Sequence, residues 1–409
     1  PLYRMTSSLR VRSLRETLEE AQRVAAIWGV TRVVDTTWLD DIGIPVFASI
    51  RPDAHPRSLC VHNGKGSQAL EAHVGALMEA IEFRAAEDRE RKIERRVTTA
   101  GNLVAEWSTL VNSFDWLDLC PLLGRVVTAD TRVQVSSFRE LRNNDVAWLP
   151  TDLLVHPNDP LEGSECPFGT STNGLSSGNT VSESLIHGIC EVLERDVRSF
   201  NFLEDRSYLV EARSAGQPTI LQLIDSVESA GYQLVVRETP NQYDLPYYDA
   251  YVIEKNLHSP IAISLGSGLH PIRDIALVRA ISEAVQSRLT HIHGGRDDII
   301  DRHKYYSIQR EGLEYQDVAK MAKTLSSGKV RDLSTANIDI LDIDDALKLL
   351  YSRVQEAELS GIYWASLPCP SRQLAVTRVV IPGAEYYKGT FERVGKRLRK
   401  AAMQRLSLI

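Results

Sequence analysis

The sequence predicts a mixed fold of helices and β-strands, and two kinds of pattern support this prediction. In several segments apolar residues recur at three- and four-residue steps, as they do along one face of an amphipathic helix. These segments predict helices at 13–27, 68–89, 178–196, 272–290 and 342–359. Short runs rich in β-branched and aromatic residues, bounded by glycine or proline, are typical of strands. They predict strands at 30–35, 44–51, 151–155, 232–237, 248–254, 261–266, 362–366 and 374–381.

Three stretches are less regular. Residues 97–148 have no assignable pattern, and their tryptophans suggest packed aromatic side chains. Residues 295–341 are largely hydrophilic and predict an insertion or a lid. In the tail, residues 388–409, we expect an amphipathic helix that packs by Leu398, Ala402 and Leu406, with a partner surface on its basic face as the alternative.

Composition excludes several classes of protein. The chain has 409 residues, enough for two or three structural units, and its net charge of −7 argues against a nucleic-acid partner. It has no apolar run of about 18 residues and no signal-peptide pattern in residues 1–10, so we expect a cytoplasmic protein without a membrane partner. The five cysteines form no C-x-x-C pair, which gives no support to a structural zinc site.

The predicted helix at 178–196 has an unusual polar face. At about 100° per residue, a stripe about 120° wide carries most of its acidic side chains. The stripe contains Asn179, Glu183, His187, Glu191 and Glu194. We expect either Asn179 or Ser182 to cap this helix. A solvated outer face is the ordinary explanation of such a stripe, and His187 is either part of a site or a structural histidine.

Two further predicted helices repeat this arrangement. In one, Gly75, Glu79 and Glu82 share a face; the other presents Arg279, Glu283 and Gln286. Carboxylates with amide and guanidinium neighbours are the groups that bind Mg²⁺ and phosphate. By contrast, Gly64-Lys65-Gly66 is too short to be a phosphate-binding loop of the Walker type.

These motifs resemble those of the YcaO superfamily. That family carries S-x-x-x-E-x-x-E, then N-x-x-x-E-x(7)-E-x-x-E, then R-x-x-x-E-x-x-Q, and the three sets of residues above match in order and spacing. Further matches are 30–46, 64–66, 266–271 and 380–385, so the resemblance spans roughly residues 4 to 387. One departure is Gly75, which stands where the family usually has serine.

The resemblance implies a fold. It is the α+β class, a YcaO-like fold with mixed sheets and motif-bearing helices around a Mg-ATP site. Residues 1–409 are then a single YcaO domain with subdomains. The expected parts are an N-terminal part at about 1–150, a central nucleotide-binding part at 151–294, an insertion or lid at 295–341, and a C-terminal helix, strands and tail helix at 342–409. A homodimer is compatible with this fold.

The resemblance also implies roles for the motif residues, with ATP and Mg²⁺ as cofactors. The catalytic residues are Glu191, Glu194 and Arg279. The metal ligands are Glu79, Glu82, Glu183, Glu191 and Glu194. Nucleotide binding is assigned to Arg10, Thr17, Gly75, Glu79, Glu82, Asn179, Glu183, Arg195, Glu283 and Gln286.

The implied activity is ATP-dependent O-phosphorylation of a peptide-backbone amide in the biosynthesis of a ribosomally made, post-translationally modified peptide. Sulfide as the nucleophile gives a thioamide, a side chain gives an azoline, and an amine gives a macroamidine. We favour thioamide formation because residues 30–46 look most like members that act with a TfuA partner or alone, and because residues 404–409 lack the proline-rich tail of azoline-forming members. The expected partners are a precursor peptide and a TfuA-like or leader-peptide-binding protein. An ATP-binding accessory protein is the alternative of another class.

Overall fold

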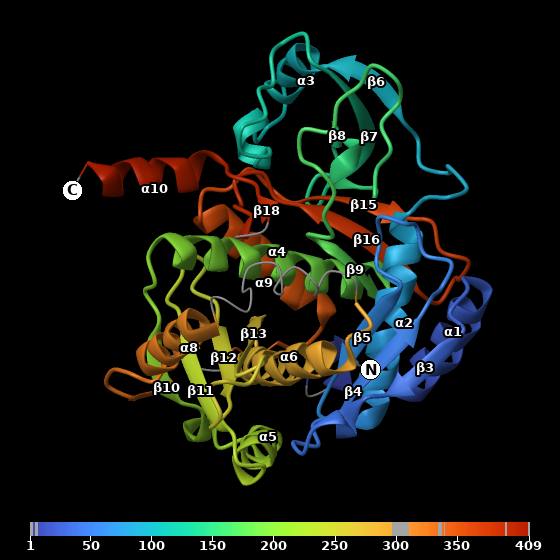
Figure 1. The fold of residues 1–409 in the computed structure, drawn as a ribbon. Coiled ribbons are helices and arrows are strands. Elements are labelled where there is room, and N and C mark those ends of the chain that lie inside the picture. Colours follow the sequence, from blue (N-terminus) through green and yellow to red (C-terminus); the bar gives the residue numbers. More distant parts are fainter. Residues whose placement is uncertain are drawn as a thin grey trace.

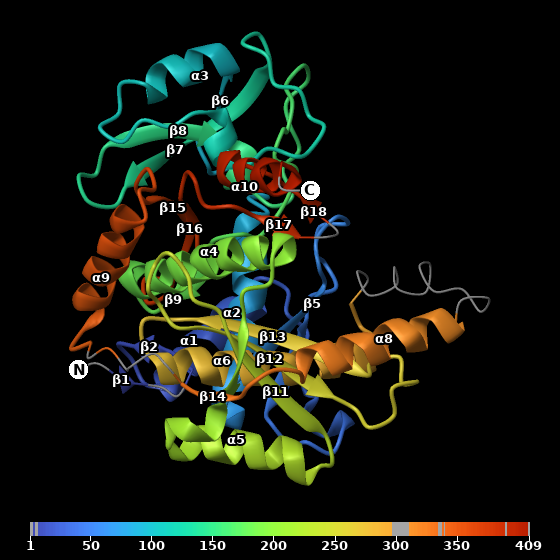
Figure 2. The same cartoon turned by 90° about the vertical axis from the view of Figure 1, so that its left-hand side faces the viewer.

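The computed structural model describes residues 3–4, 7–296, 311–333, 338, 340–388 and 391–407. Residues 297–310, 334–337 and 339 of the expected lid lie outside the described residues, as do residues 408–409 of the tail. The mixed α+β architecture expected from the sequence is confirmed. Figures 1 and 2 show helices packed against several separate sheets around one long central helix.

An antiparallel three-stranded sheet with two helices forms the N-terminal part. Its strands, in order, are β3 (Arg32–Asp35), β4 (Val46–Ile50) and β5 (Val61–Lys65), so the hairpin expected from 30–35 and 44–51 is confirmed. Its two helices are α1 (Leu14–Ile27) and α2 (Ala69–Ala86). Ala21 and Val24 of α1 pack on Leu77 and Ile81 of α2 in one hydrophobic core. The chain enters α1 through a short hairpin of β1 (Tyr3–Arg4) and β2 (Leu9–Arg10).

A second sheet lies beside it. In spatial order its strands are β13 (Ile263–Leu269), β12 (Tyr247–Ile253), β11 (Gln233–Glu238), β10 (Tyr208–Glu211) and β14 (Arg331–Asp332). Three helices accompany it: α5 (Pro218–Ser229), α6 (Arg273–His293) and α8 (Glu311–Leu325). Adjacent residues of β11 point to opposite faces: Val236 belongs to the core that includes α5 and α6, and Val235 packs with Leu325 at the end of α8.

A third sheet joins the region that the sequence left unassigned to the C-terminal strands. Its order is β6 (Arg96–Thr99), β7 (Arg132–Glu140), β15 (Tyr363–Leu367), β16 (Ala375–Val380) and β9 (Leu175–Gly178), with β8 (Val146–Pro150) also on β7. With α3 (Ala100–Trp107), strands β6 to β8 form the upper lobe of Figure 1.

The strand predicted at 151–155 is wrong. Strand β8 ends at Pro150, and Thr151–Leu153 is a turn of 3₁₀ helix in which Thr151 O accepts the backbone N–H groups of Leu154 and Val155. Residues 153–155 are all buried. The apolar run therefore indicated burial, which a turn under the core satisfies as well as a strand does.

The central helix is α4 (Val181–Leu203), with α9 (Ile343–Glu356) packed beside it. Its apolar face, including Ile189 and Leu193, is buried in the core that it shares with α9. The predicted caps are wrong. Thr180 caps the helix by accepting the N–H of Glu183 at 3.2 Å, while the Asn179 side chain bonds to Thr17 and Glu183.

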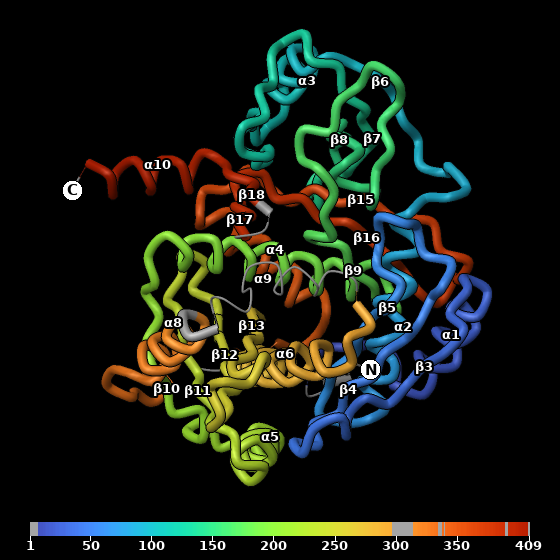
Figure 3. The backbone as a smooth tube through the Cα atoms, viewed as in Figure 1, coloured from blue at the N-terminus to red at the C-terminus, as the bar shows by residue number. Residues whose placement is uncertain are grey.

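The chain ends in a helix that projects from the body. After a hairpin of β17 (Tyr387–Lys388) and β18 (Phe391–Glu392), α10 (Lys396–Leu406) extends outward, as Figure 3 shows. Leu398 is buried, but Leu406 is 67% exposed, so the expected packing by Leu406 is wrong because the second half of α10 leaves the surface. In the described part of the chain, no helix has the length and apolarity needed to span a membrane.

Candidate active site

A cavity of about 460 Å³ lies where the three motif-bearing helices meet. Strand β5, strand β17 and Tyr386, the residue just before β17, also line it. From β5 and α2 come Asn63, Gly64, Lys65, Gly75, Glu79 and Glu82; from α4 come His187, Glu191, Glu194, Arg195 and Arg198; and from α6 come Arg279, Glu283 and Gln286. Residues more than 200 positions apart in the sequence thus surround one space.

Four carboxylates of the cavity are each held by one oxygen. Glu82 accepts the Ser177 hydroxyl at 2.6 Å, Glu194 accepts Leu269 N–H at 3.1 Å, and Glu79 accepts Asn63 N–H. Glu191 uses Oε1 both for Gly174 N–H, at 2.9 Å, and for Arg195. Within the described residues no hydrogen bond reaches the second oxygen of these four groups, so each can serve a bound cation.

The charge state of these carboxylates reflects their crowding. Burial raises the pKa of Glu82 to about 8 and that of Glu194 to about 7, and neighbouring carboxylates add to both shifts. Burial also raises the pKa of Glu79. Glu283 differs: burial acts to raise its pKa, but Lys65, Arg279 and Arg198 together lower it below the usual value. A divalent cation would favour the ionised form of the whole group.

Arginine and lysine side chains line the same cavity as these carboxylates. Some form ion pairs with a carboxylate, and others form none among the described residues. Arg195 pairs with Glu191, and Lys65 pairs with Glu283. Arg198 and Arg279 line the cavity, and within the described residues neither makes a hydrogen bond or an ion pair. A guanidinium group without a protein partner can donate two parallel hydrogen bonds to the oxygens of one phosphate group.

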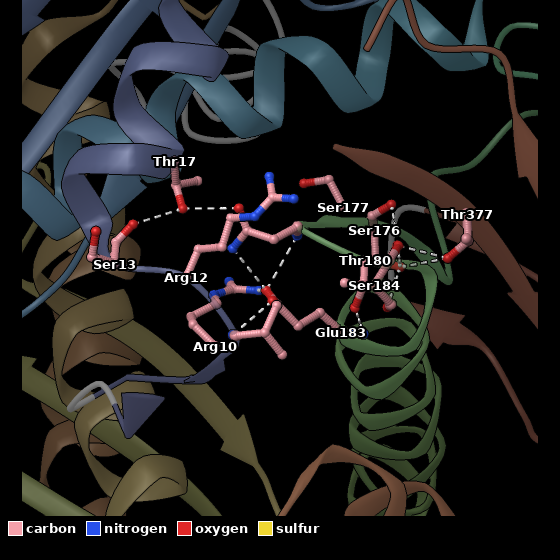
Figure 4. Close-up of polar contacts among 12 residues, drawn as sticks. Arg10, Arg12, Ser13, Thr17, Ser176, Ser177, Thr180, Glu183, Ser184 and Thr377 are labelled. Carbon is pink, nitrogen blue, oxygen red and sulfur yellow. Dashed lines mark hydrogen bonds and ion pairs between the residues drawn. The ribbon is translucent and has the colours of Figure 1, made fainter. Parts of the chain in front are cut away.

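Three predicted site residues do not line the cavity and lie behind its wall: Thr17, Asn179 and Glu183. Arg10 Nη1 and Val11 N donate to Glu183, at 3.1 and 2.9 Å (Figure 4). Asn179 Nδ2 donates to the same carboxylate at 3.2 Å, and the Thr17 hydroxyl donates to Asn179 Oδ1 at 2.9 Å. Both oxygens of Glu183 are thus engaged, and Glu183, Asn179 and Thr17 fix Arg10, which does line the cavity. Metal binding by Glu183 stays a prediction.

His187 lines the cavity, and burial together with nearby Arg279 and Arg10 holds its pKa well below the usual range. It is therefore neutral at physiological pH.

Gly75 has a physical explanation. A Cβ atom at position 75 would lie 3.2 Å from Gly64 Cα on the neighbouring strand, and a Cβ at Gly64 would overlap the backbone of Ala72 and Ala76. Strand β5 and α2 are in close backbone contact here. Glycine at 75 avoids the crowding that a serine would add, and the cavity has no hydroxyl at this position.

The sequence did not identify several lining residues: Arg198, Arg296, Tyr386, Tyr387 and Lys388. Arg198 could have been found, because it follows Glu194 by four positions and thus shares its helix face. The others come from segments without a local pattern.

The donor set fits a magnesium–nucleotide complex. In the described part of the chain, no three histidine, cysteine, aspartate or glutamate side chains are grouped closely enough to form a metal cage by themselves. Mg²⁺ in nucleotide sites commonly has one or two carboxylate ligands, several waters and phosphate oxygens. Among the described residues, carboxylates with one oxygen unbonded and arginines without an ion pair line the same cavity. This combination matches such a site, which is typical of proteins that bind a nucleotide with its metal.

The family follows from direct comparison. Residues 63–385 match the family model described as YcaO cyclodehydratase, ATP- and Mg²⁺-binding. The chain belongs to the YcaO family. The family expected from the sequence is thereby confirmed, and ATP and Mg²⁺ are confirmed as its cofactors.

Relatives and a solved structure agree with this assignment. An uncharacterised protein of Methanothermobacter thermautotrophicus is 30% identical over 94% of this chain and 97% of its own length. A protein described as lying in the tfuA 3′ region of Rhizobium leguminosarum bv. trifolii is 29% identical over 92% of this chain and 90% of its own. The structure of YcaO from Methanopyrus kandleri bound with AMPPCP and Mg²⁺ has a TM-score of 0.72 and 21% identity, over 96% of this chain and 97% of the other.

Proposed function

We propose that this chain binds ATP with Mg²⁺ in the cavity and uses it to activate a backbone amide of a ribosomally made peptide. One observation carries the proposal: residues of three distant motifs, from α2, α4 and α6, line a single cavity. The lining combines several carboxylates with two guanidinium groups, of Arg198 and Arg279, that have no ion-pair partner among the described residues. The cavity volume of about 460 Å³ is in the usual range for a small-molecule site.

The reaction we propose has three steps. A nucleophile adds to the amide carbonyl carbon, and the resulting oxyanion attacks the γ-phosphorus of ATP, which forms an O–P bond and releases ADP. The carbon–oxygen bond then breaks, and the oxygen leaves as part of inorganic phosphate. With sulfide as the nucleophile, the S–H proton is released to solvent as the C=S bond forms; in azoline formation it is the amide N–H proton, as the C=N bond forms. Such transfers depend on positioning and charge neutralisation more than on covalent help from the protein. Mg²⁺ supplies part of that neutralisation when bound.

In this reaction we assign the catalytic roles to Glu191, Glu194 and Arg279. The first two hold the metal through their free oxygens, and Arg279 binds phosphate because no protein group competes for its guanidinium among the described residues. Arg10, Arg195 and Lys65 are further cationic groups of the cavity, and each is held by an ion pair with a glutamate. Glu183 and Asn179 fix Arg10 from behind.

We favour thioamide formation with sulfide over azoline formation. The support is the relative from the tfuA 3′ region, which covers nearly the whole chain and suggests a TfuA-like partner. Azoline formation is the alternative, since the family description names a cyclodehydratase.

The test is reconstitution of the purified chain with ATP, Mg²⁺, sulfide, a short precursor peptide encoded beside its gene and any TfuA-like protein encoded there. Exchange of one peptide oxygen for sulfur, with ADP released, is the expected result. Loss of one water from the peptide without sulfide would establish cyclodehydration. ATP turnover with an unchanged peptide would favour the accessory class.

A further inference from the structure

One wall of the cavity comes from the C-terminal part of the chain. Tyr386, Tyr387 and Lys388 line the cavity, although they lie almost 200 residues after the central motif. The Arg195 guanidinium carbon lies 5.4 Å from the centre of the Tyr386 ring. A guanidinium group at this distance from an aromatic face is attracted by the ring. Tyr386 therefore helps to set the position of Arg195.

A buried carboxylate on α4 fastens this wall. Asp196 follows Arg195 directly and is 1% exposed. Its Oδ1 accepts the backbone N–H of Glu385 and Nη1 of Arg397, both at 2.6 Å, and its Oδ2 accepts the Tyr243 hydroxyl at 2.7 Å. The residue immediately before Tyr386 is thus bound to the residue immediately after Arg195.

A second buried carboxylate fastens the wall to α10. Glu385 accepts the backbone N–H groups of Gly395 and Leu398, at 2.6 and 2.9 Å, where α10 begins. Arg397 Nη1 also donates to Gly383 O at 2.8 Å. We call Asp196, Glu385 and Arg397 the C-terminal clasp. Its bonds connect α4, the cavity wall and the start of α10.

A purely structural role is the plain alternative for such a cluster. Buried ion pairs contribute little net stability, because the desolvation of both partners opposes their attraction. A structural role does not explain where this cluster lies. The hydrogen bond between Asp196 and Glu385 joins the residue after Arg195 to the residue before Tyr386, directly beside the contact between Arg195 and Tyr386.

We propose that the C-terminal clasp holds the Tyr386 ring against Arg195, so that the Arg195 guanidinium is fixed at the cavity and ready for a phosphate group. Asp196, Glu385 and Tyr386 are then positioning residues in the reaction. This role rests on the proposed function, because a phosphate group in the cavity is what Arg195 is positioned for.

The first test uses Tyr386→Ala and Tyr386→Phe, with AMPPCP and Mg²⁺ as the probe in calorimetry. Loss of the ring should weaken binding about tenfold, the size of a partly desolvated cation–π contact, whereas Tyr386→Phe keeps the ring and should restore most of the affinity. If Tyr386→Phe binds as weakly as Tyr386→Ala, the hydroxyl and not the ring matters, and the proposal fails.

The second test uses Asp196→Asn, with Arg397→Gln as a second variant and Asp225→Asn, at an exposed site on α5, as the matched control. The Glu385 and Tyr387 amides donate to Asp196 and Ser199, so their hydrogen exchange reports the wall directly. We expect faster exchange at both amides and AMPPCP affinity as weak as in Tyr386→Ala. Faster exchange with unchanged affinity would reduce the clasp to a structural role. Unchanged exchange in both variants would also overturn the proposal.

These two measurements separate the clasp from the proposed function. Hydrogen exchange is measured without nucleotide, so it tests the clasp whether or not the chain binds ATP. If the wild-type chain binds no AMPPCP, the proposed function is refuted. If the Glu385 amide exchanges as fast as exposed amides, the clasp is refuted.

Discussion

At the scale of the residue, four carboxylates of the cavity have hydrogen bonds from the described residues to only one of their two oxygens. Glu79, Glu82, Glu191 and Glu194 each use one oxygen for a protein hydrogen bond. Burial of several carboxylates together is unfavourable unless a cation joins them. The sequence predicted these residues from helical spacing, because local periodicity places side chains on one face. Their exact partners, such as Ser177 and the N–H of Leu269, come from other strands and had no sequence signal.

Glu191→Gln tests the metal role of a single carboxylate. The amide keeps the shape of the side chain but removes one negative charge, so peptide-dependent ATP turnover should fall on the order of 100-fold, as with other losses around a metal. Steady-state kinetics at saturating Mg²⁺ measures this. Glu19→Gln, at an exposed site on α1, is the control. A rate equal to that of the control would remove Glu191 from the catalytic set.

His62 makes the protein sensitive to acid. Burial, with a contribution from Arg51, lowers the pKa of His62 to about 3, and among the described residues neither ring nitrogen has a partner. In the unfolded chain its pKa is about 6.5. The unfolded state therefore binds more protons below that pH, and stability falls as the pH drops from about 6.5 towards 3.

His62→Leu should remove this contribution. Between pH 7 and pH 5, the wild type should lose about 2 kcal/mol more unfolding free energy than the variant. Urea unfolding at the two pH values measures the difference. Equal losses in the two proteins would show that His62 is not buried in its neutral form.

At the scale of the element, hydrophobic periodicity predicted α1, α2, α4, α6 and α9. It gave no prediction for α5 or for α8, which lies in the stretch expected as an insertion or lid. Helix α4 buries its apolar face as expected because a face of that length has only one way to pack. The strand predicted at 151–155 is a 3₁₀ turn, because a few apolar residues indicate burial but do not determine the backbone conformation. The second half of α10 was misplaced for a related reason: its periodicity predicts a helix but not its neighbour, and Leu406 is exposed.

The contact between β5 and α2 gives an element-scale prediction. Gly64→Ala should cost about 3 kcal/mol or more, because its Cβ would overlap the backbone of Ala72 and Ala76, which cannot move independently. Gly75→Ser should cost about 1 kcal/mol, since its nearest neighbour, Gly64 Cα, needs to move only slightly from 3.2 Å. Urea unfolding compares the two variants. Equal stability would contradict the close backbone contact.

At the scale of the whole molecule, three motif helices form the site together with residues from β2, β5, β9 and β17. The sequence predicted the three helices, and the resemblance to YcaO proteins grouped them. No local sequence pattern predicted that Tyr386 and Lys388 line the cavity, because their position depends on a chain path that returns to α4 after β16. Gly64 and Lys65 belong to strand β5 and not to a Walker loop, and Lys65 lines the same cavity.

The central claim is that separate elements form one magnesium–nucleotide site, and calorimetric binding of AMPPCP tests it most directly. Three variants, Glu79→Gln on α2, Glu191→Gln on α4 and Arg279→Gln on α6, sample the three helices, with Glu19→Gln as the control. We predict that the wild type and the control bind AMPPCP only with Mg²⁺ present, and that each of the other three binds at least about tenfold more weakly. Binding that is independent of Mg²⁺, or unchanged in the variants of α2 and α6, would contradict it.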